Sequence, residues 1–398
     1  MLRIVFLTIT LITVFVDAAI GQSRNANNID KLPSIIWEIT FGDETSVYSN
    51  EYISILTKTN ELIVGGYSET HTNGKTNNNG IWIWKVSESG AKTCDVDIKN
   101  ITIGRITYEL NNIQSMIVND DETIVLVVNT TKSSSLLLKI NFNGDILLSK
   151  NIGETKSIYK IISLSNNCLL LIGEDNGYPA FIKIDETGNN LWSKGSDRSK
   201  YGNFIDGIAT KDGGFLLVEN TGASSKTNTD ITDIFIIKYN ASGEKQNEIH
   251  LSGKYGNIGI GQNNNVAILY DKSRTYAQDV WLQVYDSDFV PSWNTSIASS
   301  VLNIGNYKMS IFQNSSYMIA GNEVRTFKPL VTYVDQSGKI VWSYLSQSPE
   351  KGSNTDLVCS SLSCYVVYSV YTLLTKDDII TKIKVIRFHP QATAAKVE

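Results

Sequence analysis

Two aspartates and two tyrosines are the side chains of this 398-residue chain that are best placed to do chemistry. Asp206 and Asp356 stand just before the first strand-like run of their repeats, and Glu51 is close to the matching place in an earlier repeat. Tyr159 and Tyr307 fall at the same level. Together they predict an acidic and aromatic rim that suits a polar ligand, a sugar or a cation. The alternative is ordinary turn chemistry, because Asp favours the turns that precede strands.

Other reactive groups are few. The three histidines, His71, His250 and His389, show no metal-ligand spacing. The sequence holds no Gly-rich phosphate loop, no nucleophile elbow and no zinc-binding helix motif. We therefore expect neither a cofactor nor a metal, and carboxylates are left as the candidates for acid–base catalysis.

Long polar loops offer a second kind of candidate site. Arg274 and Tyr276 fall in one loop and Arg325 in another, and Arg with Tyr is the composition of interface hot spots. Residues 68–80 are also polar and predict a loop on the same face. The alternative for each loop is a variation of length in solvent without a binding role.

A recurring turn motif defines the elements that must position these residues. A strand ends in a basic or apolar residue, and a polar turn follows, usually closed by Gly. The copies recur about every fifty residues, and such a period indicates a repeat architecture. The seven copies lie at 85–90, 139–144, 183–188, 238–243, 284–288, 333–338 and 387–390.

Each of the first six repeats contains four strand-like runs, of which the second is the most hydrophobic, and no stretch after the N-terminus has sustained helical periodicity. Four antiparallel strands per repeat predict an all-β, seven-bladed β-propeller. The last repeat has only three such runs, and an orphan strand at 34–41 resembles a fourth strand. We expect that N-terminal strand to complete the last blade. The alternative is two smaller sandwiches, which would need a linker.

Two of the turns lead into a tryptophan. Residues 185–192 and 335–342 read Asp, a polar turn closed by Gly, and then Trp192 and Trp342. They resemble the repeats of secreted, bacterial-type quinoprotein-like β-propellers, in which such a Trp docks between blades. In both copies the Asp is one residue closer to the Gly than in that family, and no quinone site is matched. The resemblance implies a propeller and little else.

The N-terminus has the pattern of a secretory signal peptide over residues 1–21. Arg3 precedes an uncharged apolar run at 4–16, and Ala19 and Gly21 are small residues at the positions that a signal peptidase reads. A membrane anchor is the alternative. We expect a linker at 22–33, the propeller at 34–390 and a tail at 391–398, in a secreted, extracellular protein.

Two covalent features are predicted for an oxidising compartment. Cys359 and Cys364 flank a tight turn and are placed to form a disulfide, although two small core residues are the alternative. Asn-x-Ser/Thr sequons are candidate glycosylation sites if the host is a eukaryote. The five sequons begin at Asn100, Asn129, Asn240, Asn294 and Asn314.

The function is less defined than the fold. A net charge of −5 with 19% charged residues argues against a nucleic-acid partner. We expect a non-enzymatic binding or scaffold module that recognises an extracellular protein or glycan on its loop-rich face, and a membrane contact only if the signal segment is retained. One alternative is a glycosidase or lyase that uses carboxylates at the channel mouth. Another is a structural surface or matrix protein.

Overall fold

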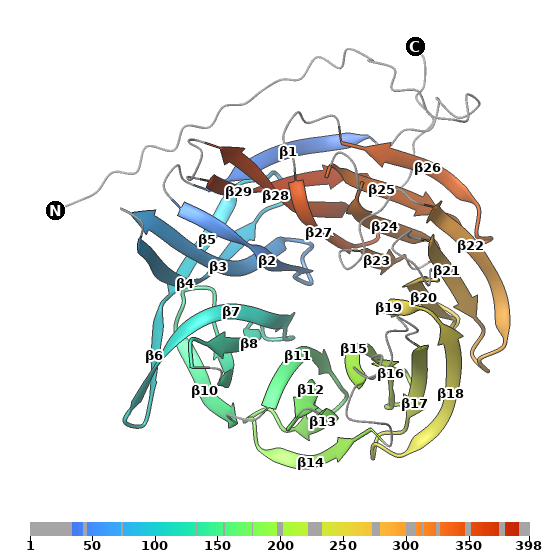
Figure 1. Cartoon of the computed structure of the whole chain (residues 1–398), viewed down its shortest axis with the longest axis horizontal. Helices are drawn as coiled ribbons and strands as arrows, with labels where there is room; N and C mark the ends of the chain where they lie inside the picture. Colours follow the sequence, from blue (N-terminus) through green and yellow to red (C-terminus); the bar gives the residue numbers. More distant parts are fainter. Residues whose placement is uncertain are drawn as a thin grey trace, which may run out of the picture.

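The chain folds into a closed ring of seven β-blades (Figure 1). The computed structural model describes residues 34–389, apart from 43–45, 73–74, 133, 154–155, 177, 197–201, 222–232, 273–278, 300–306, 313, 324–326, 347–351 and 374–378. Within the described residues every regular element is a strand. The predicted all-β, seven-bladed propeller is therefore confirmed.

The first three blades each run from an inner strand at the channel to an outer strand at the rim. Blade 1 comprises β2 (Ser46–Leu56), β3 (Leu62–Thr72), β4 (Lys75–Val86) and β5 (Lys92–Ile98). Blade 2 comprises β7 (Ile106–Val118), β8 (Ile124–Thr130), β9 (Ser135–Ile140) and β10 (Ile146–Gly153). Blade 3 comprises β11 (Lys156–Ser163), β12 (Leu169–Asp175), β13 (Tyr178–Ile184) and β14 (Asn190–Gly195).

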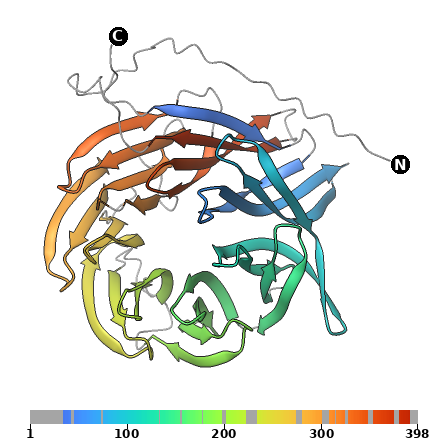
Figure 2. The same ribbon diagram turned by 180° about the vertical axis from the view of Figure 1, so that it is seen from behind.

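The remaining blades repeat this order around the ring (Figure 2). Blade 4 comprises β15 (Gly202–Ala209), β16 (Phe215–Thr221), β17 (Asp233–Tyr239) and β18 (Lys245–Ser252). Blade 5 comprises β19 (Lys254–Ile260), β20 (Val266–Asp271), β21 (Asp279–Tyr285) and β22 (Pro291–Ser299). Blade 6 comprises β23 (Lys308–Ile311), β24 (Tyr317–Asn322), β25 (Pro329–Val334) and β26 (Ile340–Leu345). Blade 7 comprises β27 (Gly352–Cys359), β28 (Cys364–Leu373), β29 (Ile379–Phe388) and β1 (Ile35–Phe41).

The N-terminal strand closes the ring. β1 pairs antiparallel with β29, in a register that runs from Ile35 opposite Phe388 to Phe41 opposite Ile383. Blade 7 therefore combines three strands from the end of the described chain with one from its beginning, as predicted. Such pairing ties both ends into one sheet and opposes fraying. The alternative of two separate sandwiches is wrong.

The core lies between the blades, because each sheet is apolar on both faces. The second strands are buried throughout or nearly so, as β8 and β20 illustrate. One cluster joins Phe181 of blade 3 to Phe204, Phe215 and Tyr239 of blade 4. A single four-stranded blade would expose half of this apolar surface, and the ring removes it from water.

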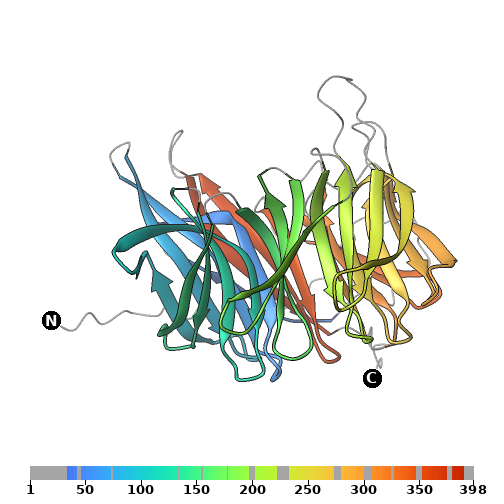
Figure 3. The same ribbon diagram turned by 90° about the horizontal axis from the view of Figure 1, so that it is seen from below.

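The repeated turn has a structural explanation on what we call the turn face, where first strands lead to second strands and third to fourth (Figure 3). In blade 3, Asp185 Oδ1 accepts hydrogen bonds from the backbone N–H of Thr187 and of Asn189, at 2.9 and 2.8 Å. Gly188 closes this turn at φ +75°, a conformation that favours Gly. The Asp and Gly of the motif therefore build an Asx turn.

The basic residue before the turn also has a partner. Three of these lysines pair with a carboxylate in the turn between the first and second strands of the same blade. The pairs are Lys85 with Glu61 at 2.6 Å, Lys139 with Asp121 at 2.9 Å, and Lys238 with Asp212 at 2.9 Å. The motif is thus an architectural signature of the blade, not a binding site.

Two segments on the opposite face, which we call the loop face, differ from the sequence interpretation. Residues 68–80, whose polarity predicts a loop, continue β3 and β4 as a paired extension up to Thr72 and Lys75. β6 (Asn100–Ile103) forms an additional hairpin with the start of β7, where Asn100 pairs with Glu109. Residues 68–72 and 75–80 contain no large apolar side chain, so no alternating pattern marks them as strands in the sequence.

Candidate functional site

The inner strands position the predicted rim residues around the channel. In every blade except blade 6 this strand carries at least one register shift, where extra residues form a bulge. We define the girdle position as the residue three places before the end of each inner strand. From blade 1 to blade 7 the girdle residues are Ile53, Ser115, Lys160, Asp206, Asn257, Lys308 and Asp356. The two predicted carboxylates therefore occupy equivalent places.

Asp206 links three consecutive blades. Its Oδ1 accepts a hydrogen bond from the ammonium of Lys160 in blade 3 and from the backbone N–H of Gly207 at 2.8 Å. Its Oδ2 accepts from Asn257 Nδ2 at 2.8 Å and from the backbone N–H of Ile258 at 2.9 Å, both in blade 5. Only 3% of Asp206 is exposed, so the carboxylate is buried with both oxygens hydrogen-bonded.

Asp356 makes the corresponding link where blade 7 meets blade 1. Its Oδ2 accepts from the backbone N–H of Ser54 at 2.6 Å and from the Ser54 hydroxyl at 2.7 Å. Its Oδ1 accepts from the backbone N–H of Leu357 at 3.0 Å. This residue is also buried.

Two polar, neutral girdle residues, Ser115 and Asn257, follow the same rule. Ser115 Oγ accepts from the backbone N–H of Ile161 at 3.0 Å, and Asn257 Oδ1 accepts from that of Met309 at 2.9 Å. In each case a side chain of one blade accepts a hydrogen bond from the inner strand of the next. The hydrogen bonds of these girdle residues therefore hold neighbouring blades together.

This arrangement keeps the two carboxylates apart. The inner strands β15 and β27 lie on opposite sides of the channel (Figure 1). Asp206 on β15 and Asp356 on β27 are each engaged in their own joint between blades. A glycosidase needs two carboxyl groups about 5–10 Å apart on either side of one bond. Among the described residues, no group of three or more His, Cys, Asp or Glu side chains could hold a metal ion.

The two girdle lysines differ in their environment. Lys160 forms an ion pair with Asp206. Lys308 holds the equivalent place in blade 6, where the inner strand has no register shift, and its side chain is exposed. No described residue forms an ion pair with Lys308. It therefore presents an ammonium group to solvent at the channel, next to Tyr307. The sequence offered one signal for Lys308: its position in the repeat is equivalent to those of Asp206 and Asp356.

The predicted rim tyrosines each lie near a carboxylate. Tyr159 is half-buried, and burial together with the neighbouring Glu174 raises the pKa of its hydroxyl to about 12. Burial, and then the charge of Asp271, raises the pKa of Tyr307 well above its usual value. Asp271 in turn accepts a hydrogen bond from the backbone N–H of Asp279 at 3.0 Å. Both tyrosines remain neutral at physiological pH.

A third pair of this kind was missed in the sequence, because Glu69 falls in the segment 68–80 that was expected to be a loop. Tyr67 on β3 donates a hydrogen bond to Glu69 at 3.0 Å. Burial and Glu69 raise the pKa of Tyr67 to about 12, with a smaller effect of Glu109 on β7. Of the other predicted site residues, Glu51 lies in β2, and Arg274, Tyr276 and Arg325 lie outside the described residues.

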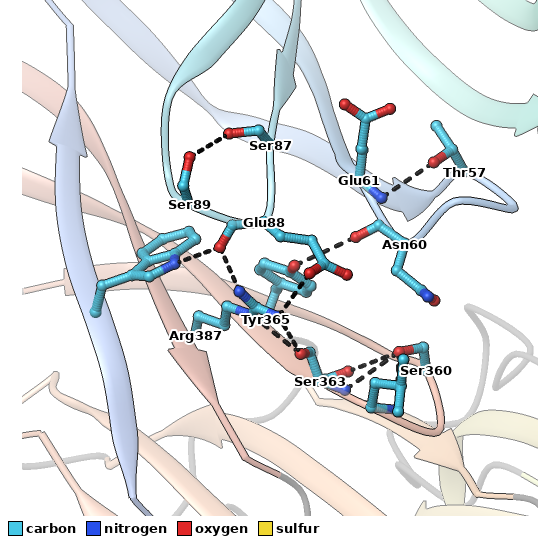
Figure 4. A network of polar contacts seen from close by, with 12 residues as sticks. Thr57, Asn60, Glu61, Ser87, Glu88, Ser89, Ser360, Ser363, Tyr365 and Arg387 are labelled. Atoms are coloured by element: carbon cyan, nitrogen blue, oxygen red, sulfur yellow. Dashed lines mark hydrogen bonds and ion pairs between the residues drawn. The ribbon is translucent and has the colours of Figure 1, made fainter.

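The predicted disulfide forms between Cys359 and Cys364, at the turn-face end of blade 7. A polar network lies beside it, where blade 7 meets blade 1 (Figure 4). Arg387 donates to Ser363 Oγ through Nε at 3.0 Å and to the carbonyl of Glu88 in blade 1. Trp37 Nε1 donates to the same carbonyl at 2.8 Å. This network and Asp356 hold the same joint at its two ends.

The sequons differ in how far their amides are engaged. Asn100 on β6 and Asn294 on β22 are exposed. The amide oxygens of the other three accept hydrogen bonds within the fold: Asn129 from Ser135, Asn240 from Ser242 and Asn314 from Ser316. Their glycosylation stays a prediction. No helix among the described residues is long and apolar enough to span a membrane.

The likeness to known proteins is structural. No protein-family model matches the sequence, and no curated protein matches it at a significant level. A prolyl endopeptidase structure aligns with a TM-score of 0.53 and 13% identity over 86% of this chain, which spans 50% of that protein. Drosophila Plexin A, solved in complex with Semaphorin 1b, aligns with a TM-score of 0.50 and 6% identity, over 90% of this chain and 88% of that one.

A third structure is the β-propeller domain of the Trilobed protease from Pyrococcus furiosus, with a TM-score of 0.49, 13% identity and coverage of 86% and 94%. At such identities the likeness shows the fold alone. The strand order itself defines the class of protein as a seven-bladed β-propeller, closed by an N-terminal strand. The more specific relation to quinoprotein-like propellers stays a prediction.

Proposed function

We propose that this chain is a secreted, non-enzymatic binding module that takes an extracellular protein or glycan at its loop face. The observation that supports this most is the use of the girdle carboxylates. Asp206 and Asp356 are buried and accept hydrogen bonds on both oxygens, so neither is available as a general acid or base.

The remaining rim offers contacts that suit recognition. Lys308 is an exposed cation on a rigid inner strand, and Tyr159 beside Glu174 adds a neutral hydroxyl and an aromatic ring. A charged hydrogen bond to a ligand and a ring on which a sugar or side chain can lie are typical of binding surfaces. The ring of blades holds these groups in fixed positions, which lowers the entropy cost of binding.

Secretion is part of the same proposal. The signal-like residues 1–21 support it. The Cys359–Cys364 disulfide is compatible with an oxidising compartment.

The test is a glycan array probed with the mature chain, followed by affinity capture of proteins from the secreting organism if the array is negative. Replacing Lys308 by Ala should weaken binding about ten- to a hundredfold, because a charged hydrogen bond contributes roughly 1.5–3 kcal/mol. Lys339→Ala is the matched control, since Lys339 is exposed on the turn face. A combined substitution of Arg274, Tyr276 and Arg325 tests the predicted loops.

Equal binding by the Lys308 and Lys339 variants and by the loop variant would contradict a site on the loop face. Hydrolysis or elimination of any arrayed glycan by the unmodified chain would contradict a non-enzymatic role. Self-association without any captured ligand would favour a structural protein instead.

A further inference from the structure

A tryptophan fills the outer part of several joints between blades. Trp192 on β14 of blade 3 lies against the turn of blade 4, where a Cβ on Gly243 would come within 2.9 Å of the indole. Trp293 of blade 5 stands in the same relation to Gly338 of blade 6. The turn glycine is required at these joints because the indole ring leaves no room for a side chain.

The joint between blades 2 and 3 lacks this ring. Leu148 on β10 pairs with Lys139 as Trp192 pairs with Lys183, so Leu148 occupies the tryptophan position. Three further aromatic residues of the joint between blades 3 and 4 are replaced by smaller ones at the equivalent strand positions. The replacements are Leu137 for Phe181, Leu169 for Phe215 and Ile184 for Tyr239.

A pocket of about 210 Å³ lies at this joint. Leu137, Leu171, Ile182 and Ile184 form its apolar part, and Gly188 also lines it. These residues correspond to members of the cluster that surrounds Trp192 in the next joint, including Phe181, Leu217, Ile237 and Tyr239. The pocket therefore lies among the counterparts of the residues that surround Trp192. Leu148 is near Gly188 but does not itself line the pocket.

The polar edge of the pocket also resembles the surroundings of Trp192 in the next joint. Lys150 lines the pocket and donates a hydrogen bond to Asn189 at 2.8 Å. Its equivalent, Lys194, holds its ammonium 5.6 Å from the centre of the Trp192 ring. A cation at that distance attracts the face of an aromatic ring. An aromatic occupant would thus find both an apolar floor and a cation.

We infer that this pocket binds a small, flat aromatic molecule of about the size of indole. Apolar cavities of about 150 Å³ are known to hold benzene, and this pocket is larger. The exposed Asn189 and Asn190 at its edge leave it accessible from solvent. The site lies at the outer part of the ring and is distinct from the loop-face site proposed above.

The test uses free indole as the probe, with calorimetry and ligand-detected NMR on the mature chain. Leu148→Trp should abolish binding, because the chain then supplies the ring itself. Leu147→Trp is the matched control: it adds the same ring at the neighbouring position, which is 53% exposed, and should leave binding unchanged. Lys150→Met should weaken binding about two- to fivefold through loss of the cation.

Ile184→Tyr, which restores another aromatic residue of the next joint, is a second blocking variant should Leu148→Trp fold poorly. In the unmodified chain, indole protons should show contacts to the methyl groups of Leu137 and Ile184. Absence of binding at millimolar indole, or binding that persists in both blocking variants, would overturn the inference.

Discussion

The carboxylate of Asp356 accepts two hydrogen bonds from Ser54, a residue 302 positions earlier in the chain. The contact joins the inner strand of the last blade to that of the first. On the outer side of the same joint, Arg387 and Trp37 both donate to the carbonyl of Glu88. Closure of the ring is thus secured near the channel and at the rim by independent sets of polar contacts.

Replacing Asp206 by Ala should destabilise the fold strongly. The substitution leaves the ammonium of Lys160, the amide of Asn257 and the backbone N–H of Ile258 without their acceptor. Removing one partner of a buried charged network costs about 3–5 kcal/mol, which chemical denaturation of the purified chain would measure as a lower free energy of unfolding.

Asp120→Ala is the control for that experiment. The Asp120 side chain is 91% exposed and pairs with Lys58 at the surface, so its loss should change stability by less than about 0.5 kcal/mol. A similarly small effect of Asp206→Ala would show that the girdle does not hold the blades together and would reopen a ligand-binding role for this carboxylate.

These contacts explain why the fold was predictable while the site was not. Alternating polarity and the Gly-closed turns follow from local physics, and the orphan strand at 34–41 could be matched to Trp-bearing fourth strands by its sequence. The position of Asp206 at an inner strand was also predictable. Whether its carboxylate points to the channel or into a joint depends on a bulge and on Asn257, 51 residues away, and no local pattern records either.

Segments with a weak polarity pattern show the same limit of prediction from the sequence. Polar strands such as 68–72 differ little from loops in composition, and only their pairing with 75–80 reveals them. The pocket between blades 2 and 3 could have been suspected from Leu148, which breaks the pattern set by Trp192. A smaller side chain does not by itself create a cavity, because neighbouring residues can fill the space.

Stability should fall in acid through the carboxylates of the turn face. The hydroxyl of Thr210 and the ammonium of Lys238 hold the pKa of Asp212 at about 2 in the folded state. The unfolded value is about 3.9, so the contribution of this group is present above pH 4 and is lost as the pH falls toward 2. Asp212→Asn should therefore reduce the slope of unfolding free energy against pH in that window.

Asp288→Asn is the structural control, because Asp288 is exposed in the turn of blade 5 and its side chain accepts no hydrogen bond in the described structure. Its unfolding free energy at neutral pH should equal that of the unmodified chain within about 0.5 kcal/mol. If Asp212→Asn keeps the original slope between pH 4 and pH 2, the pairing of Asp212 with Lys238 contributes nothing to folding stability.

The disulfide should contribute a modest amount. Cys359 and Cys364 are five residues apart, and closing so short a loop stabilises a protein by about 2 kcal/mol in the chain-entropy model. A Cys359→Ser, Cys364→Ser double variant should lose about that much in chemical denaturation. Under reducing conditions the unmodified chain should have the same unfolding free energy as the double variant. Cys168→Ser is the control, and the reductant should lower its unfolding free energy by the same amount as that of the unmodified chain.

Trp192→Leu should convert the joint between blades 3 and 4 into a copy of the joint before it. The substitution removes the ring that packs against Phe181 and Phe215, at centroid distances of 5.9 and 6.4 Å, and should cost about 2–3 kcal/mol of unfolding free energy. Leu191→Ala, at the neighbouring position that is 52% exposed, should cost less than about 0.5 kcal/mol. Equal losses in the two variants would show that the indole does not stabilise the joint.

If the loss at Trp192 is larger, as expected, the Trp192→Leu variant should also acquire a second indole site. Binding there should be weaker, because Phe181, Phe215 and Tyr239 fill more of their joint than Leu137, Leu169 and Ile184 fill of theirs.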